Sequence, residues 1–82
     1  MKLPHDLSGT ELSKLLRRYR YEITRQTGSH LRLTSKLRGT EHHVTVPAHK
    51  DLKLGTLAAV LAEVATYLQV VRSELERELF GE

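Results

Sequence analysis

The chain has 82 residues, a formal net charge of +3 and no cysteine. This length corresponds to one domain, residues 1–82, which buries only about 60 to 65 % of its unfolded surface, so we expect a thin two-layer structure. The lack of cysteine excludes disulfides and Cys-ligated zinc and is typical of a reducing cytoplasm. No early apolar run resembles a signal peptide, and no run approaches the roughly 18 apolar residues of a membrane span. We therefore expect a cytoplasmic protein with no membrane association.

Charge is unevenly distributed along the chain. Residues 1–55 hold 11 Lys/Arg and 5 Asp/Glu, whereas residues 56–82 hold 2 and 5. A basic region is the usual electrostatic footprint of nucleic-acid binding, since each neutralised phosphate releases counterions. A plain solvated surface is the alternative interpretation. The acidic C-terminal part suits a different face, one that meets protein.

The first predicted element is a helix from residue 9 to about Tyr19. Ser8 is a good N-cap, Glu11 closes a capping box, and Leu7 can pack onto Leu12. The apolar residues then recur with helical spacing and define one buried stripe, at Leu12, Leu15, Leu16 and Tyr19.

From Arg20 the period changes to two, which predicts strands. In the first strand Tyr21, Ile23 and the stem of Arg25 are expected on one face. A turn at 27–29 follows, in which Gly28 can adopt positive φ. In the second strand His30, Arg32 and Thr34 alternate with Leu31 and Leu33, and a third strand covers 42–46. Three short strands with tight loops predict an antiparallel meander with one free face.

A second helix follows, with Thr56 as the expected N-cap. Its apolar pattern continues to Leu79, which allows one helix of about 23 residues and about 35 Å. That is longer than so small a domain. Either this helix projects to pack on a partner, or it breaks at 69–71 and a short final helix begins near Arg72 or Ser73.

The order helix, three strands, helix is most simply buried by packing two helices on one face of the sheet. This predicts an α+β, α-β-β-β-α fold like that of double-stranded-RNA-binding domains, with a possible extra C-terminal helix over about 69–82.

Three sequence blocks, taken together and at this spacing, resemble the HicA-type toxins of toxin–antitoxin systems. They are Tyr21–His30 (YEITRQTGSH), Val44–His49 (VTVPAH) and Lys53–Leu57 (KLGTL). The resemblance covers about residues 8–66. The chain differs in carrying Arg20 where the family commonly has a glycine, and in its longer tail.

The resemblance implies a small RNA endonuclease that cleaves messenger RNA, a HicB-type antitoxin that inhibits it, and His30 as the catalytic residue. A histidine with a reference pKa near 6.5 can act as acid or base at neutral pH, which suits RNA cleavage. The backbone amides of Gly28 and Ser29 are expected to approach a phosphate. No cofactor is implied.

Several basic residues are candidates for phosphate contacts: Arg32, which shares the predicted face of His30, and Arg25, Arg38, Arg17, Arg18 and Lys36. Lys53 lies beside a predicted helix N-terminus, where a phosphate can be held by the dipole. The second proton-transfer group stays open between His43, Lys53, His49 and none of these. A metal site is not expected, because His42 and His43 point to opposite faces and no carboxylate lies at ligand spacing.

Two other function classes remain open. The chain could be a non-catalytic RNA-binding module, or a protein-interaction module whose C-terminal helix docks on a partner or forms a homodimer.

Overall fold

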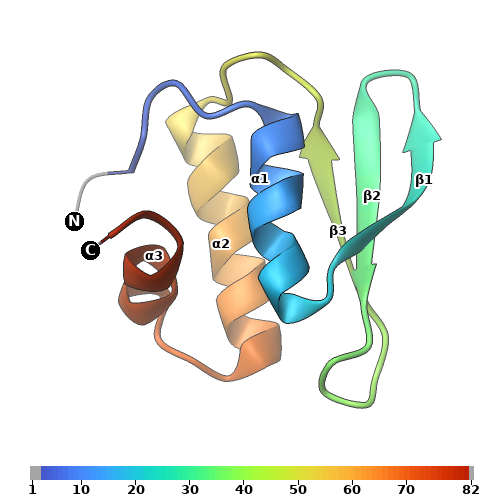
Figure 1. Cartoon of the computed structure of the whole chain (residues 1–82), viewed down its shortest axis with the longest axis vertical. Helices are drawn as coiled ribbons and strands as arrows, with labels where there is room; N and C mark the ends of the chain where they lie inside the picture. Colours follow the sequence, from blue (N-terminus) through green and yellow to red (C-terminus); the bar gives the residue numbers. More distant parts are fainter. Residues whose placement is uncertain (1–2, 82) are drawn as a thin grey trace.

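A three-stranded antiparallel sheet with helices on one face forms the protein, as the sequence predicted (Figure 1). The computed structural model describes residues 3–81, so Met1, Lys2 and Glu82 of the predicted domain lie outside the described residues. The elements are α1 (Gly9–Leu16), a 3₁₀ turn η1 (Arg17–Tyr19), β1 (Glu22–Thr27), β2 (His30–Ser35), β3 (His42–Pro47), α2 (Leu54–Leu68) and α3 (Arg72–Phe80). The strand order is β1-β2-β3, so β2 is central.

The predicted capping box starts α1. The Ser8 hydroxyl accepts a hydrogen bond from the Glu11 amide at 3.0 Å, and the Glu11 carboxylate accepts one from the Ser8 amide at 2.9 Å. These bonds favour the ionised carboxylate and lower the pKa of Glu11. Leu12 and Leu16 of the predicted stripe are fully buried, whereas Leu15 and Tyr19 are only partly buried.

The core lies between the helices and the inner face of the sheet. Its strand residues follow the predicted alternation, at Leu31, Leu33, Val44 and Val46, and the helices contribute Leu12, Leu16, Leu57, Val60, Leu61, Val64 and Leu75. Each fully buried side chain of this kind contributes about 1.5 to 3 kcal/mol. At one end of the core the buried Tyr21 hydroxyl bonds to His42 Nδ1 at 2.7 Å, and the His42 ring stacks on Tyr67.

Gly9 joins α1 to the end of β3. Its amide donates to the His49 carbonyl at 3.0 Å, and a Cβ at this position would lie 1.8 Å from the Pro47 carbonyl oxygen. Only glycine permits this approach, which fixes the loop after β3 against the start of α1.

The C-terminal region breaks into two helices. The residue Gln69 ends α2 in the left-handed conformation, with φ of 60°, and α3 begins at Arg72, as one of the two predicted alternatives required. The expected N-cap was wrong: Lys53 holds that position, because helical hydrogen bonding already begins at the Leu57 amide, which donates to the Lys53 carbonyl. Thr56 lies within the first turn.

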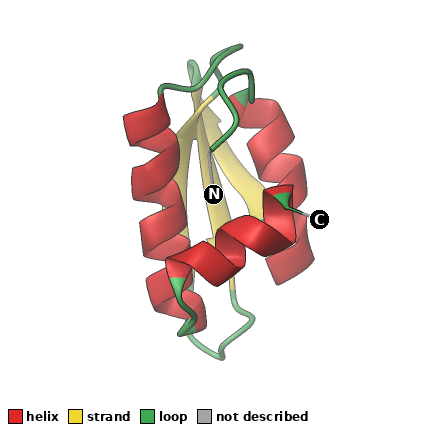
Figure 2. Cartoon of the chain, turned by 90° about the vertical axis from the view of Figure 1, so that its left-hand side faces the viewer, coloured by secondary structure: helices red, strands yellow, loops and turns green. Residues whose placement is uncertain are grey.

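The helix α3 bends back across the other two helices at 111° to α2 (Figure 2). Its Leu75 is buried in the shared core, and Arg18 donates to the Glu78 carbonyl at 2.8 Å. The arrangement confirms the α+β fold of double-stranded-RNA-binding domains, with the extra helix outermost. In residues 3–81 no single helix is long and apolar enough to cross a membrane, and only the bent pair α2 and α3 together would pass by length and composition.

Candidate functional site

The face of the sheet opposite the helices is uncovered (Figures 1 and 2). We call it the open face and define it by the side chains that alternate with the buried ones. From β2 these are His30, Arg32 and Thr34, and the residues paired with them include Thr27, Arg25 and Glu22 on β1 and Thr45 and His43 on β3.

His30 is the first residue of β2, directly after a two-residue turn. Gly28 adopts positive φ, at 57°, whereas Ser29 does not, which is the pattern of a type II′ hairpin turn. The Ser29 carbonyl accepts a hydrogen bond from the Ala48 amide at 2.5 Å, so the turn is attached to the end of β3 as well. The His30 side chain is exposed on the central strand, between Thr27 and Pro47.

A β-bulge changes which face Arg25 occupies. The β1–β2 register shifts between Ile23 and Arg25, so Thr24 is an extra residue in β1. One inserted residue reverses the alternation, because side chains have a period of two along a strand. Arg25 therefore lies opposite Arg32 on the open face, and not with Tyr21 and Ile23 as the sequence predicted.

Arg25 and Arg32 form a cationic pair next to His30. Directly paired residues have Cβ atoms about 4.5 to 5.5 Å apart, and like charges in such positions repel each other. Both side chains are exposed, and within residues 3–81 neither makes an ion pair with a carboxylate. An anion over this part of the open face would relieve the repulsion.

A chain of hydrogen bonds occupies the far end of the open face. Glu41 pairs with His43 Nε2 at 3.2 Å, and His43 Nδ1 lies 2.7 Å from the Thr34 hydroxyl, which lies 2.7 Å from the Thr24 hydroxyl. Thr34 is four positions after His30 on β2, which corresponds to about 13 Å. His43 shares the predicted face with His30 but is too distant to act on the same phosphate.

Two predicted contact residues lie elsewhere. Arg38 is in the β2–β3 loop, at the opposite end of the sheet from the His30 hairpin, and its guanidinium donates to Gln69 Oε1 at 2.6 Å (Figure 1). Lys53 precedes α2 in the helical layer, at the same end as the hairpin but not on the open face. The structure thus brings together Gly28, Ser29, His30, Arg32 and Arg25.

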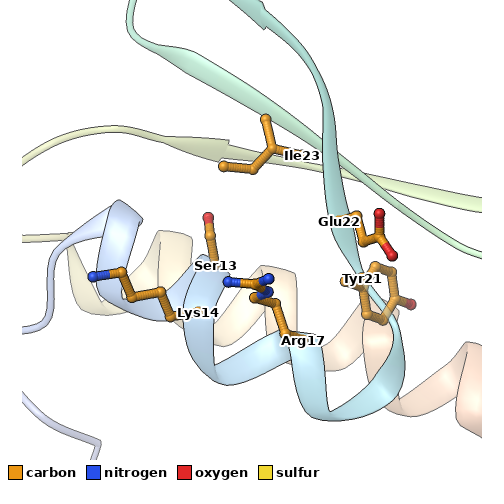
Figure 3. Close-up of a pocket in the computed structure, with 6 residues that line it drawn as sticks. All are labelled: Ser13, Lys14, Arg17, Tyr21, Glu22 and Ile23. Atoms are coloured by element: carbon orange, nitrogen blue, oxygen red, sulfur yellow. The ribbon is translucent and has the colours of Figure 1, made fainter.

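A cavity of about 280 Å³ lies on the other side of β1, between this strand and α1 (Figure 3). Lys14 extends from α1 beside Ser13, Arg17 extends from η1, and Ile23 lies above them on β1. Arg17, one of the further candidates for a phosphate contact, is therefore separated from His30 by the sheet. Lys14 and Arg17 thus place positive charge beside the sheet, but no histidine lines this cavity.

The alternation of β2 was sufficient to predict Arg32 beside His30, but nothing in the sequence marks the Thr24 bulge. Sequence reasoning also missed Thr34 as the hydrogen-bonding partner of His43, and Thr24 as that of Thr34. In the described part of the chain, no group of three or more His, Cys, Asp or Glu side chains is placed to hold a metal ion.

The sequence matches a known protein family over much of its length. Residues 9–65, which span α1, all three strands and most of α2, match the family described as HicA toxin of bacterial toxin-antitoxin systems. No curated protein and no solved structure matches the chain significantly. The match covers more than half of the chain, and the chain belongs to the HicA toxin family.

Proposed function

We propose that this protein is a ribonuclease toxin that cleaves messenger RNA at internal linkages, with His30 as its catalytic residue, and that a HicB-type antitoxin inhibits it in the cytoplasm. One observation carries the proposal: His30 stands on an uncovered sheet face directly beside two opposed arginines that no carboxylate of the described residues neutralises. The family membership supports the toxin class and an antitoxin partner.

The chemistry divides between these three side chains. Cleavage requires a proton to leave the attacking hydroxyl and a proton to reach the leaving oxygen, and an imidazole performs either transfer. The guanidinium groups of Arg25 and Arg32 hold the phosphate and offset the charge that develops in the transition state. The residues opposite His30 are Thr27 and Pro47, which are poor proton-transfer groups, so we assign the complementary transfer to water.

The decisive variant is His30→Ala. We expect it to reduce RNA cleavage by about 10² to 10⁴-fold, the usual contribution of a general acid or base. Cleavage of a labelled RNA by purified protein measures this, and growth arrest on induced expression should fall in parallel. His5→Ala is the matched control, because His5 is also exposed but lies before α1.

The outcomes separate the function classes. Equal cleavage by parent and His30→Ala would contradict the catalytic assignment. Salt-dependent binding of RNA without turnover by the parent would instead indicate an RNA-binding module. The antitoxin is tested by adding the product of a small neighbouring gene, which should suppress cleavage by forming a complex with the parent.

A further inference from the structure

The open face carries a second concave site, at the end away from His30. It is a cavity of about 350 Å³ lined by Arg20, Glu22, Thr24, Thr34 and Lys36, none of which takes part in the cleavage chemistry proposed above. Its volume is at the lower end of the range for small-ligand sites. Two cations, one carboxylate and two hydroxyls therefore converge on one space.

Arg20 is held in this position by an unusual backbone conformation. It follows η1 with φ of 66° and ψ of 23°, the left-handed region that favours glycine, and its amide donates to the Arg17 carbonyl at 2.9 Å. This conformation ends the helix, where a glycine would be free of strain. An arginine at a position with this backbone strain motivates a functional role for its side chain.

Hydrogen bonds and ion pairs connect the side chains at the floor of the cavity. Thr34 is buried and its hydroxyl contacts Thr24 and His43 at 2.7 Å each, while Glu41 holds both His43, at 3.2 Å, and Lys36, at 3.5 Å. The Lys36 side chain stays mostly exposed, so the side chains that remain available to a ligand are the donors Arg20 and Lys36 and the acceptor Glu22. A ligand here must accept hydrogen bonds from one side and donate them to the other.

We propose that this cavity binds a guanine base of the RNA strand that lies across the open face. Guanine presents two adjacent acceptors, O6 and N7, to an arginine, and its N1–H and N2 amino group donate to a carboxylate. Uracil, cytosine and adenine lack this combination of paired acceptors and paired donors. A phosphate alone fits less well, because Glu22 would repel it.

The distance between the cavity and His30 means that the bound guanine would not be directly at the cleaved linkage. Thr34 lies about 13 Å from His30 along β2, and the pair Arg25 and Arg32 lies between them. The bound RNA would therefore place its scissile phosphate over His30, an intervening phosphate over the two arginines, and a guanine base in the cavity. This inference rests on the proposed function and adds a base preference to it.

Binding without cleavage tests the inference. In the His30→Ala protein, fluorescence anisotropy compares hexauridylate with matched strands carrying one guanosine or one adenosine. We expect the guanosine strand to bind about tenfold or more tightly, as for a good bidentate base contact. Arg20→Gly in the same background should abolish the preference, and it suits the backbone because glycine accepts this φ without strain.

Lys14→Ala is the matched control, because it removes one exposed positive charge from α1 outside the cavity, and it should preserve the preference. The inference is overturned if the His30→Ala protein shows no guanosine preference, or if the preference survives Arg20→Gly. Uniform weakening of all three strands by Arg20→Gly would indicate a phosphate contact and would also overturn it. Failure of the parent to cleave RNA would refute only the proposed function, since these measurements require no turnover.

Discussion

At the scale of single residues, Gly9 is the position where one methyl group has the largest expected effect. In an isolated helix alanine is favoured over glycine by up to about 1 kcal/mol. Here the added Cβ would lie 1.8 Å from the Pro47 carbonyl oxygen, which is backbone and cannot rotate away. We expect Gly9→Ala to lower the free energy of unfolding by about 2 kcal/mol or more, measured by urea denaturation.

Gly55 provides the matched control. It also lies in the first turn of a helix, but a Cβ added there would have no other atom within 4 Å. Gly55→Ala should raise the free energy of unfolding by about 0.5 to 1 kcal/mol. If both variants changed stability in the same direction, the close approach at Pro47 would not be the cause.

The site residues differ in how far the sequence determined them. His30 and Arg32 were predictable because strict alternation with Leu31 and Leu33 fixes their face. Arg25 was placed on the wrong face, since a bulge depends on the pairing of two strands and leaves no mark in one of them. The left-handed conformation of Arg20 is likewise set by how η1 joins β1.

At the scale of elements, α3 depends on a polar contact as well as on Leu75. The Tyr19 hydroxyl donates to the Glu78 carboxylate, and burial, followed by this bond, raises the pKa of Tyr19 to about 12. The unfolded chain loses this proton near pH 10, whereas the folded chain keeps it. The contribution of Tyr19 is therefore complete below about pH 10 and is lost as the pH rises towards 12.

Tyr19→Phe tests this contact. We expect a loss of about 1 kcal/mol at neutral pH from the missing hydrogen bond, and a shallower fall in stability between about pH 10 and 12 than in the parent. Thermal unfolding at a series of pH values measures both. Tyr21 also has a raised pKa and contributes to the pH dependence of both proteins. The relevant quantity is therefore the difference in stability between parent and variant at each pH. Identical pH profiles would show that the Glu78 bond contributes nothing.

The order of elements was predictable because each has a local signal: the capping box for α1, alternation for the strands, and a β-branched run between α2 and α3. The choice between one long helix and two was not, because it depends on Leu75 entering the core of the same chain. The N-cap of α2 was misplaced for a related reason, since Lys53 caps without a side-chain bond that a sequence could reveal.

At the scale of the whole molecule, the open face and α3 carry net charges of opposite sign. The open face carries Arg20, Arg25, Arg32 and Lys36 beside Glu22, whereas α3, on the far side of the helical layer, carries Glu74, Glu76 and Glu78 against Arg72 and Arg77 (Figure 2). Such an arrangement directs a polyanion towards the open face and away from α3. The uneven charge distribution along the sequence thus produces an electrostatic potential that differs between the two sides of the folded protein.

The Thr24 bulge has a consequence for the behaviour of many copies together. The strand β1 is at the edge of the sheet, and an unprotected edge pairs readily with the edge of another molecule, whereas a bulge disrupts that pairing. Without Thr24, all the β1–β2 residue pairs could still form, now in a regular ladder, and the edge of the sheet would be straight. We expect this deletion variant to self-associate at concentrations where the parent stays monodisperse by light scattering, and unchanged scattering would contradict this. The same extra residue that places Arg25 on the open face would then also protect the protein from aggregation.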